Sequence, residues 1–199
     1  MLGLWNSIAY EMGTEPDLAV GMVVSAEHMG TGYLKEMFYR LKKDTDVPVG
    51  FFITLQGCDF GKDKEDAPYL KLILDWVYEK YASGDKAVEI QDKPYKRLSL
   101  NIRACFISCA ASSVIFDGLD VASLCVNDVD SVTLRNMFVG FWDTNIDSLN
   151  IHASSFSLYS LYLVRSFVQH SNIKRVSVTC SEVYAPDSEK MQIMESICR

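Results

Sequence analysis

The sequence predicts an α/β fold: a short β–α solenoid with a parallel sheet inside and helices outside. Two observations predict it. Strand-like apolar runs alternate with helical patterns, and a short apolar motif returns at a nearly constant step in the second half. The four copies are Tyr95-x-x-Leu98-x-Leu100, Val121-x-x-Leu124-x-Val126, Ile146-x-x-Leu149-x-Ile151 and Ile173-x-x-Val176-x-Val178. The central positions 98, 124, 149 and 176 are separated by steps of 26, 25 and 27 residues. Such steps are typical of stacked supersecondary units.

The first part of the chain, residues 18–91, contains two strand–helix units. The apolar runs at 20–24 and 49–55 suit buried strands. A helix is expected near residues 33–43, where apolar side chains recur at helical spacing, and a second helix begins at Pro68. We also expect a short third strand at 86–91. The alternation predicts parallel strands, because each return to the sheet must cross over through a helix.

The second part, residues 94–199, contains the repeated motif. Its last two copies precede clear helices at 158–170 and 188–197. The first two copies have less regular returns, for which we expect a small-residue helix at 105–112 and an extra strand at 132–134. No linker rich in Gly, Ser or Pro divides the chain, so residues 1–199 are predicted to form one domain.

Composition limits the partners and the compartment. The chain has 199 residues, 49% of them apolar, with a net charge of −7 and a pI near 4.9. Nucleic-acid binding is not expected, because it needs a concentrated basic face. No apolar run approaches the roughly 20 residues that span a bilayer, so no membrane partner is expected. The start lacks a secretory signal, and most of the six cysteines lie in apolar stretches. We therefore expect free thiols in a reducing cytoplasmic or nuclear compartment.

The repeated motif resembles the leucine-rich repeat family, in a degenerate form similar to that of intracellular proteins. The family motif is L-x-x-L-x-L-x-x-N/C-x-L, with a strand and a helix in each unit. The resemblance covers about residues 94–199, although the Asn/Cys position holds Arg103, Val129, Ser154 and Ser181. It implies a protein-interaction module, adaptor or scaffold that binds a partner protein through its sheet face and strand-end loops. An ordinary α/β domain with evenly spaced strands is the alternative.

The loop at 27–32 is the most enzyme-like feature. Gly30, Thr31 and Gly32 join a predicted strand to a helix N-terminus, where a phosphate-containing ligand could bind. His28 and Cys58 follow the first two strands, and a histidine can activate a cysteine thiolate. These residues define the alternative function, an enzyme or small-ligand binder of doubly wound type. The simpler interpretations are a tight turn in which Thr31 caps the helix, and a buried thiol.

Three residues are candidates for partner binding. Phe141 and Trp142 fall in a predicted irregular turn, where exposed aromatic side chains are good interface anchors; core packing is the alternative. His152 follows the inward-facing set of its strand, so its side chain should point outward. No cofactor is predicted. No metal is predicted either, because Cys105-x-x-x-Cys109 has no second pair of ligands with matching spacing. The sequence leaves the oligomeric state open.

Overall fold

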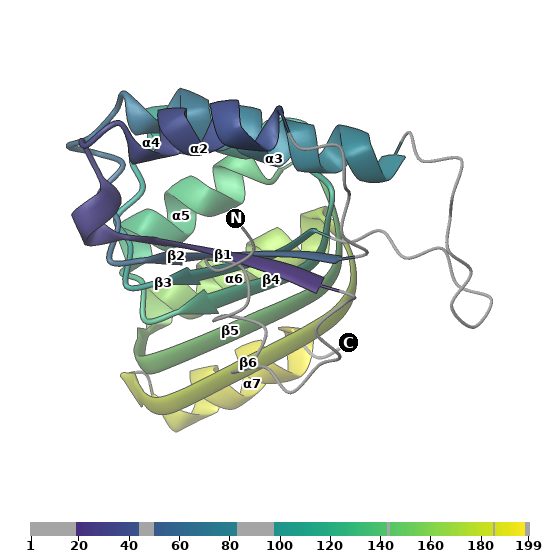
Figure 1. The fold of residues 1–199 in the computed structure, drawn as a ribbon. Coiled ribbons are helices and arrows are strands. Elements are labelled where there is room, and N and C mark those ends of the chain that lie inside the picture. The colour runs from purple at the N-terminus through teal and green to yellow at the C-terminus, as the bar shows by residue number, and fades with distance from the viewer. Residues whose placement is uncertain (1–18, 44–49, 83–97, 143, 185, 198–199) are drawn as a thin grey trace.

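The protein is described by a computed structural model, which places residues 19–43, 50–82, 98–142, 144–184 and 186–197. These residues form an α/β fold with a six-stranded, all-parallel sheet and six α-helices (Figure 1). The strands are β1 (Ala19–Ser25), β2 (Gly50–Gln56), β3 (Leu98–Arg103), β4 (Val121–Asn127), β5 (Asn145–Ser157) and β6 (Asn172–Tyr184). The helices are α2 (Tyr33–Leu41), α3 (Asp66–Ala82), α4 (Cys109–Ile115), α5 (Ser131–Gly140), α6 (Leu158–His170) and α7 (Asp187–Ile197). A short 3-10 helix, η1 (Ala26–His28), follows β1.

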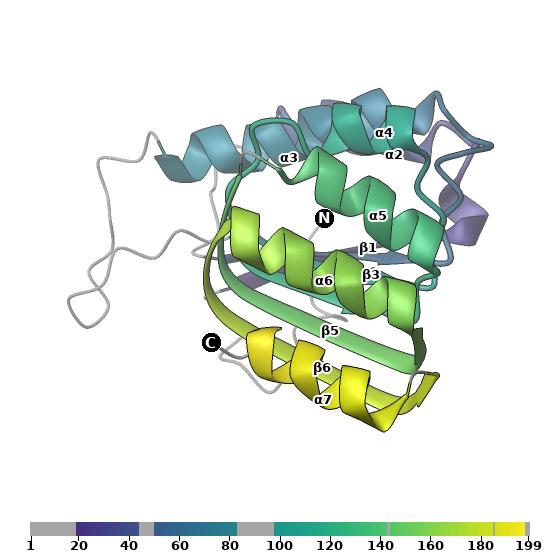
Figure 2. The same cartoon turned by 180° about the vertical axis from the view of Figure 1, so that it is seen from behind.

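The strands lie in chain order, β1-β2-β3-β4-β5-β6. Every neighbouring pair is parallel. The helices lie along one side of the curved sheet, and Figure 2 views them from that side. Elements that are close in the sequence are therefore close in space. The strands that carry the four motif copies lie side by side in the order that the even spacing predicts.

The register of the first motif copy is wrong by two residues. Leu100, not Leu98, lies opposite Leu124, and Leu98 pairs with Phe51. The true step to the next copy is therefore 24 residues, from position 100 to position 124. The error has a simple cause. Leu98, Leu100 and Ile102 all alternate onto the buried face of β3, so the sequence pattern fits two registers equally well.

Two rows of apolar side chains cross all six strands on the face that carries the helices. One row consists of Met22, Ile53, Leu100, Leu124, Leu149 and Val176. The other row consists of Val24, Leu55, Ile102, Val126, Ile151 and Val178. In both rows the side chains of β1 to β5 are buried, whereas those of β6 are half-buried. The core thus runs as a continuous layer between the sheet and the helices, and it includes the first two strands.

The turns after β2, β3 and β4 repeat one backbone conformation. Gly57, Ala104 and Asp128 each follow directly after a strand and have φ values of +65°, +48° and +48°. Their N–H groups donate to the carbonyl oxygens of Arg103, Asn127 and His152, each at 2.9 Å. Each turn is therefore hydrogen-bonded to the next unit. Because a left-handed conformation is costly for residues with a Cβ, its recurrence shows that the units share a common turn geometry.

The extra strand predicted at 132–134 is wrong, because these residues lie in α5. The β-branched pair Val132 and Thr133 favours a strand by propensity. Asp130 overrides this preference as the helix N-cap, since its side chain accepts a hydrogen bond of 2.7 Å from the backbone N–H of Thr133.

The helix predicted at 105–112 begins later than expected. Ser108 is the N-cap of α4, and its hydroxyl accepts a hydrogen bond from the N–H of Ala111 at 3.2 Å. Cys109 is therefore the first residue of this helix, and Cys105 lies in the preceding loop. The short strand expected at 86–91 lies outside the described residues.

Candidate functional site

The face of the sheet that points away from the helices is polar. Side chains alternate along a strand, so the residues between the two apolar rows point outward. One outward row consists of Thr54, Asn101, Cys125, Asn150 and Ser177. The next row, closer to the carboxyl ends of the strands, consists of Gln56, Arg103, Asn127, His152 and Thr179. Together they form a surface of amide, hydroxyl and charged groups across β2 to β6, which we call the polar sheet face.

Several amides on the polar sheet face are held by hydrogen bonds. Asn127 Nδ2 donates to Asn101 Oδ1 at 2.6 Å and to Cys125 Sγ at 3.4 Å. Asn150 Nδ2 donates to Ser148 Oγ at 3.3 Å. An asparagine side chain offers two N–H donors and one carbonyl acceptor. Side chains fixed in this way present their other hydrogen-bonding groups in a set geometry, which lowers the entropic cost of binding a partner.

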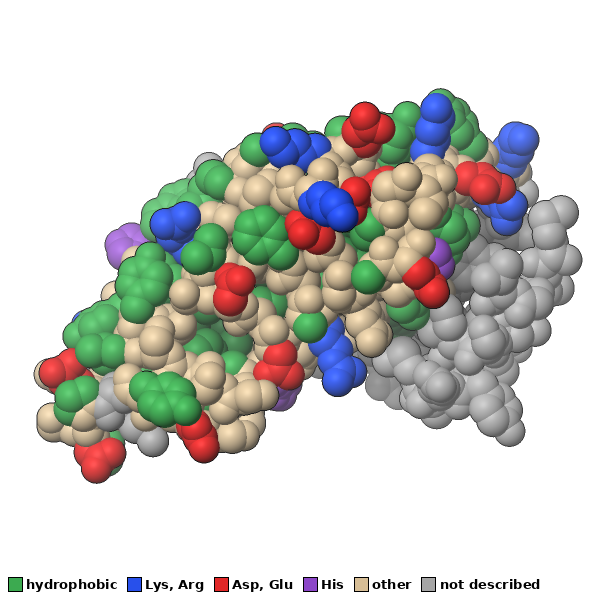
Figure 3. Space-filling view, turned by 90° about the vertical axis from the view of Figure 1, so that its left-hand side faces the viewer, with side chains coloured by type: hydrophobic (Ala, Val, Ile, Leu, Met, Phe, Trp, Pro, Cys, Tyr) green, Lys and Arg blue, Asp and Glu red, His purple; other side chains and the backbone are tan. Residues whose placement is uncertain are grey.

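A charged group lies where the polar sheet face meets the loops. Asp128 Oδ1 accepts hydrogen bonds from the hydroxyl of Ser154 at 2.9 Å and from its N–H at 2.8 Å. These hydrogen bonds lower the pKa of the Asp128 carboxyl, and the charges of Arg103 and His152 lower it further. His152 is exposed on the sheet face, as the sequence predicts. The face therefore carries both a carboxylate and basic groups. Figure 3 views the loop-bearing end of the sheet, where acidic and basic side chains are likewise interspersed.

The loop at 27–32 holds carboxylates close to its glycines. The N–H of Gly30 donates to Asp66 Oδ2 at 2.6 Å, and Asp63 Oδ1 lies 3.0 Å from the position that a Cβ on Gly30 would occupy. Gly32, in a left-handed conformation, occupies the N-cap position of α2. The Thr31 hydroxyl accepts a hydrogen bond of 3.3 Å from the N–H of Tyr33, the first residue of the helix, so the expected cap at Thr31 is confirmed in part. Phosphate binding by this loop stays a prediction, but the nearby carboxylates would repel an anion.

His28 is engaged within its own turn. Its Nδ1 accepts a hydrogen bond from the N–H of Ser25 at 3.0 Å, and its ring stacks on Tyr33 with the centroids 4.0 Å apart. Cys58 is buried, and its thiol donates to the carbonyl oxygen of Val24 at 3.3 Å. Among the described residues no hydrogen bond or ion pair joins His28 to Cys58. The catalytic pair stays a prediction that these contacts do not support.

The Cys58 thiol instead lies beside the thiol of Cys105, a contact that sequence reasoning missed. The neighbouring Cys105 side chain raises the pKa of the Cys58 thiol, and burial raises it further. The same interaction lowers the pKa of Cys105. Both side chains are buried, whereas Cys109 is exposed and does not share a helical face with Cys105. Over the described ranges, no three His, Cys, Asp or Glu side chains converge in a way that could hold a metal ion.

The predicted aromatic pair is divided between the core and the surface. Phe141 is fully buried and stacks on Phe116 with the ring centroids 4.1 Å apart, so the expectation that it is an exposed anchor is wrong. The reason is geometric: α5 ends at Gly140, and the next residue continues the buried side of the helix. Trp142 is 46% exposed and stacks on His170. Of the two, Trp142 is the one available to a partner.

Comparison of the chain with protein-family models, curated proteins and solved structures found no match. The α-helices formed by the described residues are too short or too polar to cross a bilayer. The polar sheet face and the strand-end loops are therefore the features that bear on function.

Proposed function

We propose that this chain is a short solenoid of leucine-rich-repeat type that serves as an interaction module, adaptor or scaffold. It binds another protein through the polar sheet face and the loops at the carboxyl ends of the strands. The observation that carries the proposal is the set of aligned outward rows, which leaves an uninterrupted polar surface across neighbouring strands. Stacked units give such surfaces a rigid and extended shape.

The corrected register supports the resemblance to the family at the Asn/Cys position, although the first apolar position of the motif then falls on Arg97. With Leu100 as the central residue, the Asn/Cys position of the family motif falls on Cys105 and not on Arg103. The same spacing recurs earlier in the chain as Ile53-x-Leu55-x-x-Cys58. In this interpretation the contact between Cys58 and Cys105 is one step of a ladder between neighbouring repeats. The resemblance then extends to β2, beyond residues 94–199.

The strand order argues against the doubly wound alternative. Folds of that type bind ligands in a crevice at the point where the strand order reverses. The six described strands have no such reversal, because they follow chain order throughout. Asp63 and Asp66 beside Gly30 also disfavour a phosphate at the loop. We expect inorganic phosphate or ATP at millimolar concentration to leave the Tm of the chain unchanged. A clear, saturable rise would favour the alternative.

Site-specific photo-crosslinking in cells tests the proposed surface. A photoreactive phenylalanine derivative replaces Asn150 on the polar sheet face and, as a control, Tyr39 on the outer side of α2. Tyr39 is 52% exposed and lies away from the sheet face. We expect a discrete crosslinked protein from position 150 that is absent from position 39. His152→Glu should weaken capture of that protein. Equal crosslinking from both positions, or none from position 150, would contradict the proposal.

A further inference from the structure

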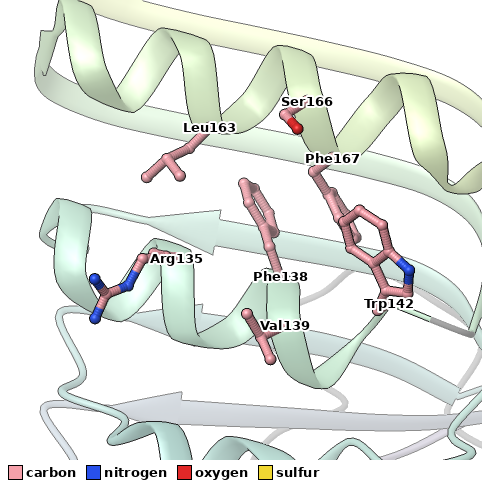
Figure 4. Close-up of a pocket in the computed structure, with 7 residues that line it drawn as sticks. All are labelled: Arg135, Phe138, Val139, Trp142, Leu163, Ser166 and Phe167. Atoms are coloured by element: carbon pink, nitrogen blue, oxygen red, sulfur yellow. The ribbon is translucent and has the colours of Figure 1, made fainter.

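A hollow of about 100 Å³ lies between the outer sides of α5 and α6 (Figure 4). Phe138 and Phe167 form its floor, with their rings stacked 4.1 Å apart. Val139, Trp142 and Leu163 form its apolar rim. Arg135 lies at the end opposite Trp142 (Figure 4). An apolar cavity of roughly 150 Å³ can hold benzene, so this hollow has the scale of one aliphatic side chain.

Exposed apolar side chains lie on the water-facing sides of both helices. On α5 Val132 and Val139 are exposed, Trp142 follows directly after this helix, and on α6 Tyr159 and Tyr162 are exposed. All five are between 45% and 52% exposed. The outer face of a helix in a soluble domain is normally polar or charged. Val139 and Trp142, which also line the hollow, therefore join it to the exposed apolar surface, and exposed apolar surface of this kind is typical of interaction sites.

Arg135 is the charged side chain among the described residues that line the hollow. The sequences of α5 and α6 contain Arg135, Arg165 and His170 but no Asp or Glu, although the chain as a whole has a net charge of −7. The Asp130 carboxylate at the start of α5 accepts a hydrogen bond from the helix N-terminus. Asp143 lies outside the described residues. Within the described part of the chain, no carboxylate lies within ion-pair distance of Arg135, whose guanidinium contacts Asn136 Oδ1 at 3.4 Å.

We propose that this hollow docks a short segment of a partner protein that inserts an aliphatic side chain between α5 and α6 and places a carboxylate on Arg135. Trp, Tyr and Arg are the residues that most often dominate binding energy at interfaces. A carboxylate next to the inserted side chain would complement the Arg135 guanidinium, which has no ion-pair partner among the described residues. A second copy of this chain is a poorer occupant, because face-to-face pairing of two acid-free helix surfaces would bring like charges together.

This surface is separate from the polar sheet face. It lies on the helical side of the molecule, so one partner on each side could bind at the same time (Figure 2). The inference therefore does not depend on the proposed function, and each can fail alone. Crosslinking from position 150 tests the polar sheet face, whereas peptide selection with variants of α5 and of Trp142 tests the hollow.

Selection from a random peptide library displayed on phage, with the whole chain as bait, tests the proposal. We expect enriched peptides to share a Leu, Ile or Met with an Asp or Glu nearby. Their affinity should fall at least about tenfold in Trp142→Ala and in Val139→Glu. It should fall similarly in Arg135→Glu and recover when the acid of the peptide is changed to Lys. Tyr39→Ala on α2 is the matched control and should bind normally.

Three results would overturn the proposal. The first is enrichment of peptides whose binding does not depend on Trp142 or Val139, or failure to enrich any peptide. The second is selection of basic peptides, or of apolar peptides indifferent to Arg135→Glu. The third is a concentration-dependent dimer, detected by analytical ultracentrifugation, that Val139→Glu dissociates, since this would make a second copy the occupant. Circular dichroism of each variant separates lost binding from lost folding.

Discussion

Gly140 at the end of α5 lies directly against Ser112 of α4. A Cβ on Gly140 would stand 2.3 Å from Ser112 Oγ and 2.7 Å from the Ser112 carbonyl oxygen. Ser112 is fully buried, and its hydroxyl donates to the carbonyl oxygen of Asn136 at 2.6 Å. The two helices therefore approach as closely as their backbones allow, and a side chain at position 140 would force them apart.

The first prediction concerns this close approach. Replacing Gly by Ala in an open helix stabilises a protein by up to about 1 kcal/mol. Here we expect Gly140→Ala to lower the free energy of unfolding by about 1–3 kcal/mol, because it overpacks a buried contact. Urea unfolding measures the change. Val139→Ala, at the exposed neighbouring position, is the control and should change stability by no more than about 0.5 kcal/mol. A stabilising Gly140→Ala would show that the helices can separate freely.

The repeated left-handed turn predicts the effects of three substitutions. Gly57→Ala should destabilise by about 1 kcal/mol, because the left-handed conformation strains a residue with a Cβ. Its new Cβ would lie 3.7 Å from that of Ala26, so a clash is not the cause. Ala104→Gly should instead stabilise by up to about 1 kcal/mol. Ala153 occupies the corresponding position within β5, but its φ is not positive. Ala153→Gly should therefore destabilise the protein, because glycine weakens the interior of a strand. Thermal unfolding of the three variants checks the signs.

The third prediction concerns the pH dependence of stability through Asp128. Its pKa is lower in the folded protein than the ordinary value of 3.8, chiefly because of the hydrogen bonds from Ser154. The stabilisation is therefore present above pH 3.8 and is lost as the pH falls below that value. Asp128→Asn tolerates the left-handed backbone equally well. We expect the wild type to be more stable than this variant at pH 7, with a difference that shrinks at pH 3. Chemical unfolding at both pH values provides the measurement.

Asp117→Asn is the control for this pH experiment. Asp117 is exposed and follows α4, away from the contact between Asp128 and Ser154. Its substitution should leave the pH dependence of the wild type almost unchanged. A gap between wild type and Asp128→Asn that stays constant from pH 7 to pH 3 would show that the carboxylate does not stabilise the turn through its charge.

The fourth prediction concerns thiol reactivity. Cys58 should resist alkylation by iodoacetamide in the folded protein at pH 8, because its pKa is raised by Cys105 and by burial, and only the thiolate reacts. Cys109 is exposed and should be modified before Cys58. Mass spectrometry of peptides from timed samples distinguishes the sites, and unfolding in guanidinium should abolish the difference. Fast modification of Cys58 in the native state would revive the hypothesis of a catalytic thiol.

Local signals account for the parts of the fold that the sequence predicts well. The helix at 158–170 is predicted with its observed bounds, and Ser157 caps it. His152 is predicted to point outward from strand alternation alone. Local signals fail where tertiary packing determines which of two neighbouring side chains is buried. Phe141 and Trp142 are adjacent aromatics, and only the position of α5 against α4 determines that one is buried and the other exposed.

Uneven spacing hides the relation between β2 and β3. From Ile53 to Leu100, which lie opposite each other in neighbouring strands, the chain runs 47 residues, about twice the later steps. Periodicity cannot align two units across such an insertion, so the shared spacing of Cys58 and Cys105 is invisible until the strand register is known. The contact between these thiols is for the same reason absent from the sequence-based candidates.

Strand pairing in chain order also affects how the protein unfolds. Each described strand is hydrogen-bonded to its neighbours in the sequence, and within the described sheet no strand pairs with one farther away along the chain. Contacts between consecutive strand–helix units allow the ends to open independently of the middle. Amide hydrogens in β3 and β4 would then exchange slowest, while β6 and α7 could detach as a unit without disturbing the rest.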